Sequence, residues 1–357
     1  MKKLVKIVIG LFVVGLVVIA SVFTYYKINI GKVSDDSTLR EVTINEGSIE
    51  SIAITLKENN FIKNVTMFKV YIRLTNKSNL KAGIYELSED MGVERIVSIL
   101  EEGTKYNPNE ISITFKEGIN IRQVATVISE NTSNSYDDVM GKLSDTNYID
   151  SLITKYWFLT DSIKNSKIYY PLEGYLYPNT YRFSSKDVSV EDIFGKMLDE
   201  MDNKLSKYKK DIEKNNLSIH DIITLASIVE KEGAKANDRK AVAGVFVNRL
   251  NDDWSLGSDV TTYYALKIDD YKVSLTEAIG LYKCDQAYNT RCNSFIGLPV
   301  GAICNPSEES IEASINPEKH NKYYFVADCK GKVYLSKNSN EHSNTINKLK
   351  RENNWCV

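Results

Sequence analysis

Two glutamates lie close together near the end of an apolar segment, "LASIVEKEG" (residues 225–233). Glu230 and Glu232 stand just before Gly233, a residue type that commonly ends helices. The C-terminal end of a helix is electrically negative, so carboxylates are disfavoured there. A carboxyl group that also loses hydration against an apolar surface keeps its proton to higher pH. Such a group can act as a general acid near neutral pH, as the cleavage of a glycosidic bond requires.

This segment is predicted to form a helix of about fourteen residues. Ser218 can cap its start, with Asp221 as a variant of the capping box, and Gly233 can close its end. Glu232 continues the bulkier of two apolar stripes on this helix. The stripes are Ile222, Leu225, Ile228 and Val229 for Glu232, and Ile223, Ala226 and Ser227 for Glu230. We therefore predict Glu232 as the acid, although spacing alone leaves open a core ion pair or exposure to solvent.

The elements that must position this helix alternate along the chain, which favours an α+β fold. Residues 28–40 form a polar tether, and residues 41–108 are expected to form a small unit of a strand, two helices, a strand and a helix. Residues 109–183 repeat the strand, Glu-Gly turn and helix, with a polar insertion at 132–170. Residues 184–357 form the domain that carries the glutamates, beginning with one long amphipathic helix at 190–216.

The N-terminus carries a candidate membrane anchor. Lys2, Lys3 and Lys6 precede a charge-free run from Ile7 to Tyr26, which is long enough to cross the hydrocarbon core of a bilayer. The positive charges predict that residues 1–27 are a single-pass anchor with a cytoplasmic N-terminus and that the rest of the chain is extracytoplasmic. The alternative is a signal peptide cleaved before Ser21. The net charge of −2 offers no basic field for nucleic acid.

The cysteines are confined to the last quarter of the chain. They are Cys284, Cys292, Cys304, Cys329 and Cys356. No zinc-type spacing occurs, and five cysteines allow at most two bridges within the chain. Cys284 and Cys292 are the first candidate pair because they are close in sequence. The connectivity stays open, and so does the alternative that all five are reduced.

Ordered motifs along the chain resemble the YceG-like (MltG) family of membrane-anchored endolytic peptidoglycan transglycosylases. The segments that carry the resemblance are "KAGIYEL" (81–87), "LEGYLYPNTY" (172–181), "LASIVEKEG", "VAGVFVNRL" (242–250), "LGSDVTTYYAL" (256–266), "AYNT" (287–290), "GLPVGAICNPSEESIEAS" (297–314), "YYFVAD" (323–328) and the late His342. Together they cover roughly residues 40–350. Two positions depart from the pattern: Val300 replaces the second Pro of a Pro-Pro loop, and Val260 replaces the Pro of Asp-Pro-Thr.

The resemblance implies a LysM-like unit at 41–108, a C-terminal catalytic domain, and lytic cleavage of MurNAc–GlcNAc bonds of nascent peptidoglycan that leaves 1,6-anhydroMurNAc ends. It also implies that the second Glu of "VEKE", Glu232, is catalytic. Glu232 would protonate the bridging oxygen and then take a proton from the C6 hydroxyl of the sugar. The expected partners are glycan strands, the cytoplasmic membrane and cell-wall synthases that the sequence does not name.

Supporting residues are expected on both sides of this acid. Glu173, Asp259, Tyr288 and Asn289 are candidate substrate-binding residues, and the alternatives are an ion pair for Glu173, a helix cap for Asp259 and turn structure for the other two. Three further residues, Glu230, Asn248 and Arg249, are expected to be structural, with Glu230 and Arg249 as a candidate ion pair. Gly297, Pro299 and Gly301 would shape a loop at the groove, and His342 would support the fold. No metal, nucleotide or redox cofactor is indicated.

Two rival functions stay open on the sequence. The first is a peptidoglycan-binding scaffold without catalysis. The second is a hydrolase that uses water, which needs a second carboxylate on the opposite face of the sugar. Glu173 and Asp259 are the candidates for that second carboxylate.

Overall fold

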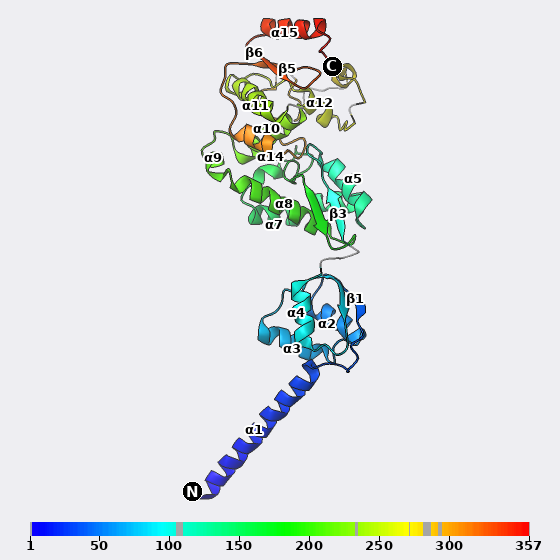
Figure 1. Cartoon of the computed structure of the whole chain (residues 1–357). Helices are drawn as coiled ribbons and strands as arrows, with labels where there is room; N and C mark the ends of the chain where they lie inside the picture. Colours follow the sequence, from blue (N-terminus) through cyan, green and yellow to red (C-terminus); the bar gives the residue numbers. More distant parts are fainter. Residues whose placement is uncertain are drawn as a thin grey trace. The chain divides into compact units, whose positions relative to one another are not determined.

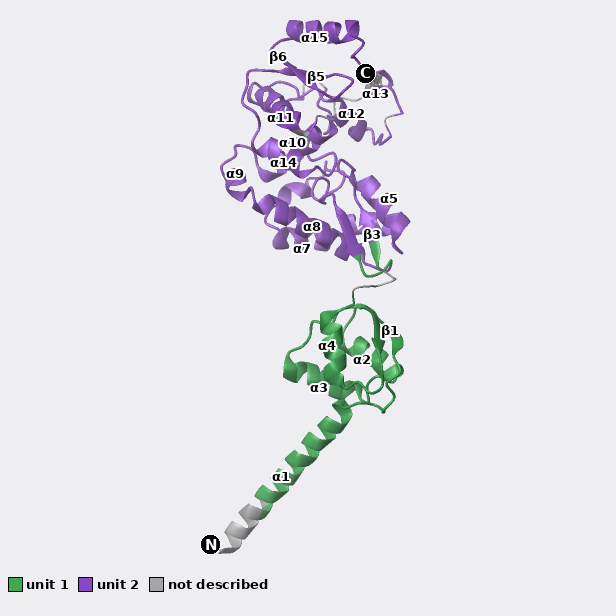
Figure 2. Ribbon diagram, in the orientation of Figure 1, with its two compact units in different colours: residues 1–111, 183–186 green, residues 112–182, 187–357 purple. Residues whose placement is uncertain are grey.

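The computed structural model describes residues 2–104, 110–232, 235–270, 272–280, 287–291 and 295–356. The chain divides into two compact units, residues 1–111 with 183–186, and residues 112–182 with 187–357 (Figure 2). Helices and the strands of short two-stranded sheets alternate along the described chain. The expected mixture of α and β elements is therefore confirmed. The domain boundaries expected from the sequence, near residues 108 and 183, stay predictions.

The first unit begins with the apolar helix α1 (Lys2–Ile30). Its segment Phe12–Ile30 is long and apolar enough to span a membrane and is not buried inside the protein (Figure 1). Tyr26 and Ile30, near the end of α1, pack against the core of the unit. The unit therefore begins directly at the end of the candidate span.

The remainder of the first unit is a small α/β body. It contains β1 (Arg40–Ile44), α2 (Ile49–Glu58), α3 (Val65–Thr75), β2 (Gly83–Leu87) and α4 (Val93–Glu102). β1 and β2 pair in antiparallel register, with Val42 opposite Tyr85. Ser48 caps α2, because its side chain accepts a hydrogen bond from the backbone of Ser51. The expected order of strand, two helices, strand and helix is thus confirmed.

The second unit is larger and mostly helical. Its elements are β3 (Ile111–Thr114), α5 (Ile121–Asn131), α6 (Tyr136–Ser144), α7 (Thr146–Lys155), the 3₁₀ turn η1 (Asp161–Lys164), β4 (Thr180–Phe183), α8 (Val190–Ser206), α9 (Lys209–Glu213), α10 (Ile219–Lys231), α11 (Ala236–Asn251), α12 (Asp259–Ala265), α13 (Leu275–Gly280), α14 (Glu308–Ile315), β5 (Tyr324–Ala327), β6 (Val333–Ser336) and α15 (Ser339–Arg351). β3 pairs with β4, and β5 pairs with β6 in antiparallel register. The single helix expected at 190–216 is wrong, because residues 207–208 interrupt it.

The helix that carries the two glutamates, α10, lies at the centre of this unit. It packs against α11, α12 and α14, and its residues from Ile222 to Val229 are all buried. The predicted capping box is present, since the side chains of Ser218 and Asp221 each accept a hydrogen bond from the backbone of the other residue. Gly233, the predicted end of the helix, lies outside the described residues. Packing against three helices therefore positions α10 within the unit.

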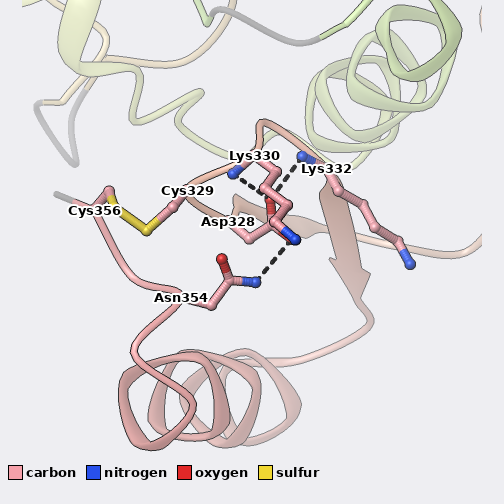
Figure 3. Close-up of a disulfide and its surroundings, with 6 residues drawn as sticks. All are labelled: Asp328, Cys329, Lys330, Lys332, Asn354 and Cys356. Atoms are coloured by element: carbon pink, nitrogen blue, oxygen red, sulfur yellow. Dashed lines mark hydrogen bonds between the residues drawn. A yellow bond between two sulfur atoms is a disulfide. The ribbon is translucent and has the colours of Figure 1, made fainter.

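A disulfide closes the C-terminal part of the second unit (Figure 3). Cys329, in the turn between β5 and β6, is bonded to Cys356 beyond α15. The same turn is fixed by Asp328, whose carboxylate accepts hydrogen bonds from the backbone of Lys330 and Lys332 and from the side chain of Asn354. Cys304 is free and buried. The candidate pair Cys284 and Cys292 lies outside the described residues.

Candidate active site

Glu232 is the residue that follows the last turn of α10. Its backbone N–H still donates to the carbonyl oxygen of Ile228, 3.0 Å away, so the position is fixed by the helix. The side chain is half-buried, neither in the sealed core nor free in solvent. Burial raises the pKa of the Glu232 carboxyl to about 7, and the nearby charge of Asp259 acts in the same direction. A substantial fraction of Glu232 therefore keeps its proton near neutral pH, in the direction that the apolar stripe predicts.

Ser258 contacts Glu232 directly. Its hydroxyl donates to Oε1 of Glu232 over 2.6 Å, and this bond favours the ionised carboxylate. Ser258 is only 3% exposed and directly precedes α12. Ser258 is not among the residues predicted from the sequence, because Asp259 is the candidate named in this segment. The signal for Ser258 is a hydroxyl directly before the start of α12.

Glu230 lies in a different environment, although it is only two residues away. Its carboxylate pairs with Arg239 at 3.1 Å, in a contact where both side chains are largely buried. It also accepts hydrogen bonds from the backbone and hydroxyl of Ser307, at 3.0 and 2.5 Å, and from the hydroxyl of Ser310 at 2.8 Å. Glu230 thus joins α10 to α11 and α14. The expected ion pair with Arg249 is wrong, because Arg249 is used elsewhere.

Arg249 and Asn248 hold the segment before β5 against α11. Arg249 donates to the carbonyl oxygens of Tyr323 and Leu256, at 2.8 and 2.5 Å. The side-chain amide of Asn248 donates to the carbonyl oxygens of His320 and Lys322, both at 2.8 Å. These contacts fit the structural role expected for both residues. The positive charge of Arg249 also favours the ionised form of Glu232.

Asp259 is the first residue of α12, and the cap position before it belongs to Ser258. Its carboxylate forms an ion pair with Arg291, and both side chains are about one-third exposed. Asp259 is therefore an accessible carboxylate near Glu232, and Arg291 lies close enough to favour ionised Glu232 as well. Of the four predicted substrate-binding residues, Asp259 is the one whose exposure suits that role.

Glu173 does not fit the predicted contact with sugar. It is 3% exposed, and both carboxylate oxygens accept from the backbone N–H of Ile121 at 3.1 Å. The hydroxyl of Tyr264 donates to it over 2.9 Å. Burial raises the pKa of Glu173 to about 8. An ion pair, the alternative for Glu173, is not its main contact either. Its carboxylate instead accepts a hydrogen bond from the backbone N–H of Ile121, the first residue of α5.

Tyr288 and Asn289 also lie in the interior instead of facing a ligand. Both are fully buried. The ring of Tyr288 packs against Tyr169 and Tyr264, with centroids 4.7 and 4.9 Å apart, and its hydroxyl accepts from the backbone of Tyr169. The side-chain oxygen of Asn289 accepts from the backbone of Arg291 at 3.2 Å. The prediction of sugar contact is wrong for these two residues, because their polar atoms serve the fold.

The glycine-rich loop and His342 occupy supporting positions. Gly301 is buried, and a Cβ there would lie 3.3 Å from Ile168. Pro299 lines an open hollow of about 500 Å³ together with Asp161, Ser162, Lys164, Asn165, His220, Asp221 and Val300. His342 stacks on Tyr324, with ring centroids 5.3 Å apart. Burial lowers the pKa of His342, so its ring stays neutral and suits packing.

A single half-buried carboxyl group with a raised pKa, a hydroxyl donor and two nearby arginines together define a site suited to acid–base chemistry. The model of the YceG-like family matches residues 42–348, so the chain belongs to the YceG-like family. The resemblance predicted from the motifs is confirmed.

Similar proteins carry a consistent description. The chain is 36% identical over 318 residues to the endolytic murein transglycosylase of Streptococcus pneumoniae serotype 2 strain D39, which covers 85% of this chain and 57% of that protein. It is 34% identical over 332 residues to the endolytic murein transglycosylase of Bacillus subtilis strain 168, and this match covers 91% of this chain and 89% of the Bacillus protein. The chain thus spans 57% of the length of the streptococcal relative.

A solved structure has the same fold. The crystal structure of a YceG-like protein from Listeria monocytogenes matches with a TM-score of 0.60 and 37% sequence identity. The match covers 86% of this chain and 99% of the other chain. The mixed α/β architecture is therefore shared with another member of the family.

Proposed function

We propose that the protein is a membrane-anchored endolytic transglycosylase that cleaves MurNAc–GlcNAc bonds of peptidoglycan glycan strands. The observation that carries the proposal is Glu232, a half-buried acid whose pKa is raised to about 7 at the end of a rigid helix. The relatives named endolytic murein transglycosylase support the same reaction class.

The chemistry needs one carboxyl group that works in both directions. Protonated Glu232 gives its proton to the bridging oxygen, and the glycosidic bond breaks as positive charge develops on the MurNAc ring. The resulting carboxylate then accepts the proton of the C6 hydroxyl. The C6 oxygen bonds to the anomeric carbon, which closes the anhydro ring and returns the proton to Glu232. A pKa near 7 suits both steps, since neither protonation state is strongly disfavoured.

The charged residues around Glu232 can support each state in turn. Arg249 and Arg291 favour the carboxylate that forms after the first proton transfer. The negative charge of Asp259 favours the protonated acid and would attract the positive charge of the sugar in the transition state. Asp259 is also the accessible candidate for binding substrate.

The hydrolase alternative now depends on Asp259. Glu173 is buried and bonded to the backbone of Ile121, so it cannot activate a water on the opposite face of a sugar. Asp259 is partly exposed and near Glu232, so it is the carboxylate that a hydrolytic reaction would use. The products of the two reactions differ by the mass of one water.

The first unit is proposed to be the LysM-like part that holds glycan. Its β1-α2-α3-β2 order, with the two strands antiparallel, supports this assignment. If this unit binds glycan and the second unit does no chemistry, the protein is a scaffold. The two alternatives differ in cleavage: the enzyme cleaves glycan through Glu232, and the scaffold does not cleave it.

Two features of the chain support the proposed membrane orientation. Lysines precede the apolar helix α1, which favours a cytoplasmic N-terminus. Cys329 and Cys356 form a disulfide, and disulfides persist mainly outside the cytoplasm. Both features support an extracytoplasmic catalytic unit beside the wall and its synthases.

The decisive experiment incubates the full-length protein in detergent with uncrosslinked glycan and measures product masses. The proposal predicts internal cleavage to anhydro ends, and loss of cleavage in Glu232→Gln at unchanged glycan binding. Glu230→Gln is the matched control on the same helix and should keep measurable activity. Products with reducing ends would establish hydrolysis, and normal cleavage by Glu232→Gln would refute the assignment of the acid.

A further inference from the structure

We propose that Ser258 is the positioning residue of the acid: it engages Oε1 of Glu232 and thereby leaves Oε2 as the oxygen that carries the transferable proton. The proposal rests on the proposed function and assigns the two oxygens of its one essential carboxyl group. It is carried by the 2.6 Å contact between the Ser258 hydroxyl and Oε1. A contact of this length is typical of a hydroxyl that donates to a carboxylate.

The backbone around Ser258 is held by buried hydroxyl groups. The backbone N–H of Ser258 donates to Oγ1 of Thr290 at 3.1 Å, and its carbonyl oxygen accepts from Oγ1 of Thr261 at 2.7 Å. The two threonine hydroxyls lie 2.8 Å from each other, and both residues are fully buried. The carbonyl oxygen of Thr290 accepts from the N–H of Gly257 at 2.8 Å. The backbone of Ser258 is therefore fixed on both sides, and its hydroxyl points to Oε1 of Glu232.

This fixed donor gives the two oxygens of the carboxyl group different roles: Oε1 accepts the hydrogen bond, and Oε2 carries the proton. A proton on Oε1 would compete with the hydroxyl that donates to that atom, so the protonated acid carries its proton on Oε2. After Oε2 gives the proton to the bridging oxygen, the negative charge is shared by both oxygens, and the hydroxyl of Ser258 stabilises the share on Oε1. The same bond would orient Oε2 toward the C6 hydroxyl for the return of the proton.

The protonation of Glu232 is then set by opposing influences from every element around it. Burial and the charge of Asp259 on α12 favour the protonated acid. The hydroxyl of Ser258, Arg249 on α11 and Arg291 in the segment 287–291 favour the carboxylate. Ser258 is the uncharged member of this set, and it touches the reacting group directly. Its removal should make the acid harder to ionise and less well oriented.

The chain offers a matched control for this test. Ser310 is also fully buried, and its hydroxyl donates to Oε2 of Glu230 over 2.8 Å. Ser258→Ala and Ser310→Ala therefore each remove one buried serine hydroxyl from one glutamate of α10. We expect Ser310→Ala to lower the melting temperature and to leave the pH profile of cleavage unchanged. Ser258→Ala should instead change the pH profile itself.

The experiment measures cleavage of uncrosslinked glycan by full-length protein in detergent between pH 5 and pH 9. In Ser258→Ala, the alkaline midpoint of kcat should move upward by about one pH unit, and the plateau rate should fall about tenfold. Ser258→Cys is the second variant, because its thiol fills the site but donates weakly, and it should shift the midpoint in the same direction. An unchanged midpoint in both variants would overturn the proposal.

A second measurement does not depend on cleavage. The difference in melting temperature between each background and its Glu232→Gln derivative follows the titration of Glu232 across pH. In the Ser258→Ala background this titration should move to higher pH, and in the Ser310→Ala background it should not. If Glu232→Gln cleaves normally, the assignment of Glu232 as the acid in the proposed function fails, while this thermal titration still decides whether Ser258 controls the proton of Glu232.

Discussion

Glu230→Gln and Glu232→Gln, the two substitutions at the end of α10, should change stability in opposite directions. The pKa of Glu232 is raised from its ordinary value of 4.5 to about 7. Between these two pH values the folded protein keeps a proton that the unfolded chain has lost, so the free energy of unfolding falls as pH rises through this window. The loss is complete above about pH 7. Glu232→Gln removes the titrating group, so it should stabilise the protein at pH 8 and have little effect at pH 4.

The size of this effect follows from the pKa. One pKa unit corresponds to about 1.4 kcal/mol, so the full effect of the raised pKa is about 3.5 kcal/mol. Because Glu232 is only half-buried, water screens part of it, and we expect about 2 kcal/mol at pH 8. For a unit of this size that is a rise of about 5 °C in Tm.

Glu230→Gln should act in the other direction at the same pH. It breaks the largely buried pair with Arg239 and weakens the bonds from Ser307 and Ser310. Loss of one partner of a buried ion pair destabilises by about 3 kcal/mol, a fall of about 8 °C in Tm. Thermal unfolding of both variants at pH 4 and pH 8 tests the reasoning. A Tm change for Glu232→Gln that is the same at both pH values would refute the burial argument. Stabilisation by Glu230→Gln would mean that Glu230, and not Glu232, is the poorly solvated acid.

Three further outcomes are expected. Asp259→Asn should still give anhydro products if Glu232 acts alone, as mass spectrometry would show; complete loss of cleavage, with reducing ends made by the native protein, would indicate a hydrolase. Glu173 has a pKa raised to about 8, so its burial destabilises the fold progressively between about pH 4.5 and pH 8. The Tm of Glu173→Gln relative to native protein should therefore rise from pH 5 to pH 9. A Tm difference that does not depend on pH would show that the carboxyl group is not buried. Non-reducing peptide mapping should find Cys329 joined to Cys356, and Cys356→Ser should destabilise the protein by about 2–4 kcal/mol; recovery of both thiols free from exported protein would contradict the bridge.

The parts of the site that local sequence determines were predictable. The capping box of Ser218 and Asp221 fixes the start of α10, and the spacing of apolar residues then fixes which glutamate lies over the bulkier stripe. Both depend on residues within four positions of each other, which the helical repeat relates directly. For the same reason the strand and helix order of the first unit could be predicted from its periodicity.

The contacts that sequence reasoning missed join distant parts of the chain. Ser258 meets Glu232 across 26 residues, and Glu173 meets the backbone of Ile121 across 52 residues. A carboxylate that satisfies the start of another helix has the same sequence signature as one that faces a ligand. The break between α8 and α9 was missed because Ile212 is buried after the turn at residues 207–208, and helical periodicity does not show that turn.

The two acids at the end of α10 lie in different electrostatic surroundings, although they are two residues apart. The helix C-terminus disfavours both carboxylates. Glu230 pairs with Arg239 and accepts three hydrogen bonds, so it links α10 to α11 and α14. Glu232 accepts a hydrogen bond from Ser258 and lies near the negative charge of Asp259, and burial raises the pKa of its carboxyl to about 7. The contacts of Glu230 therefore fix the end of α10, and Glu232 directly follows that end.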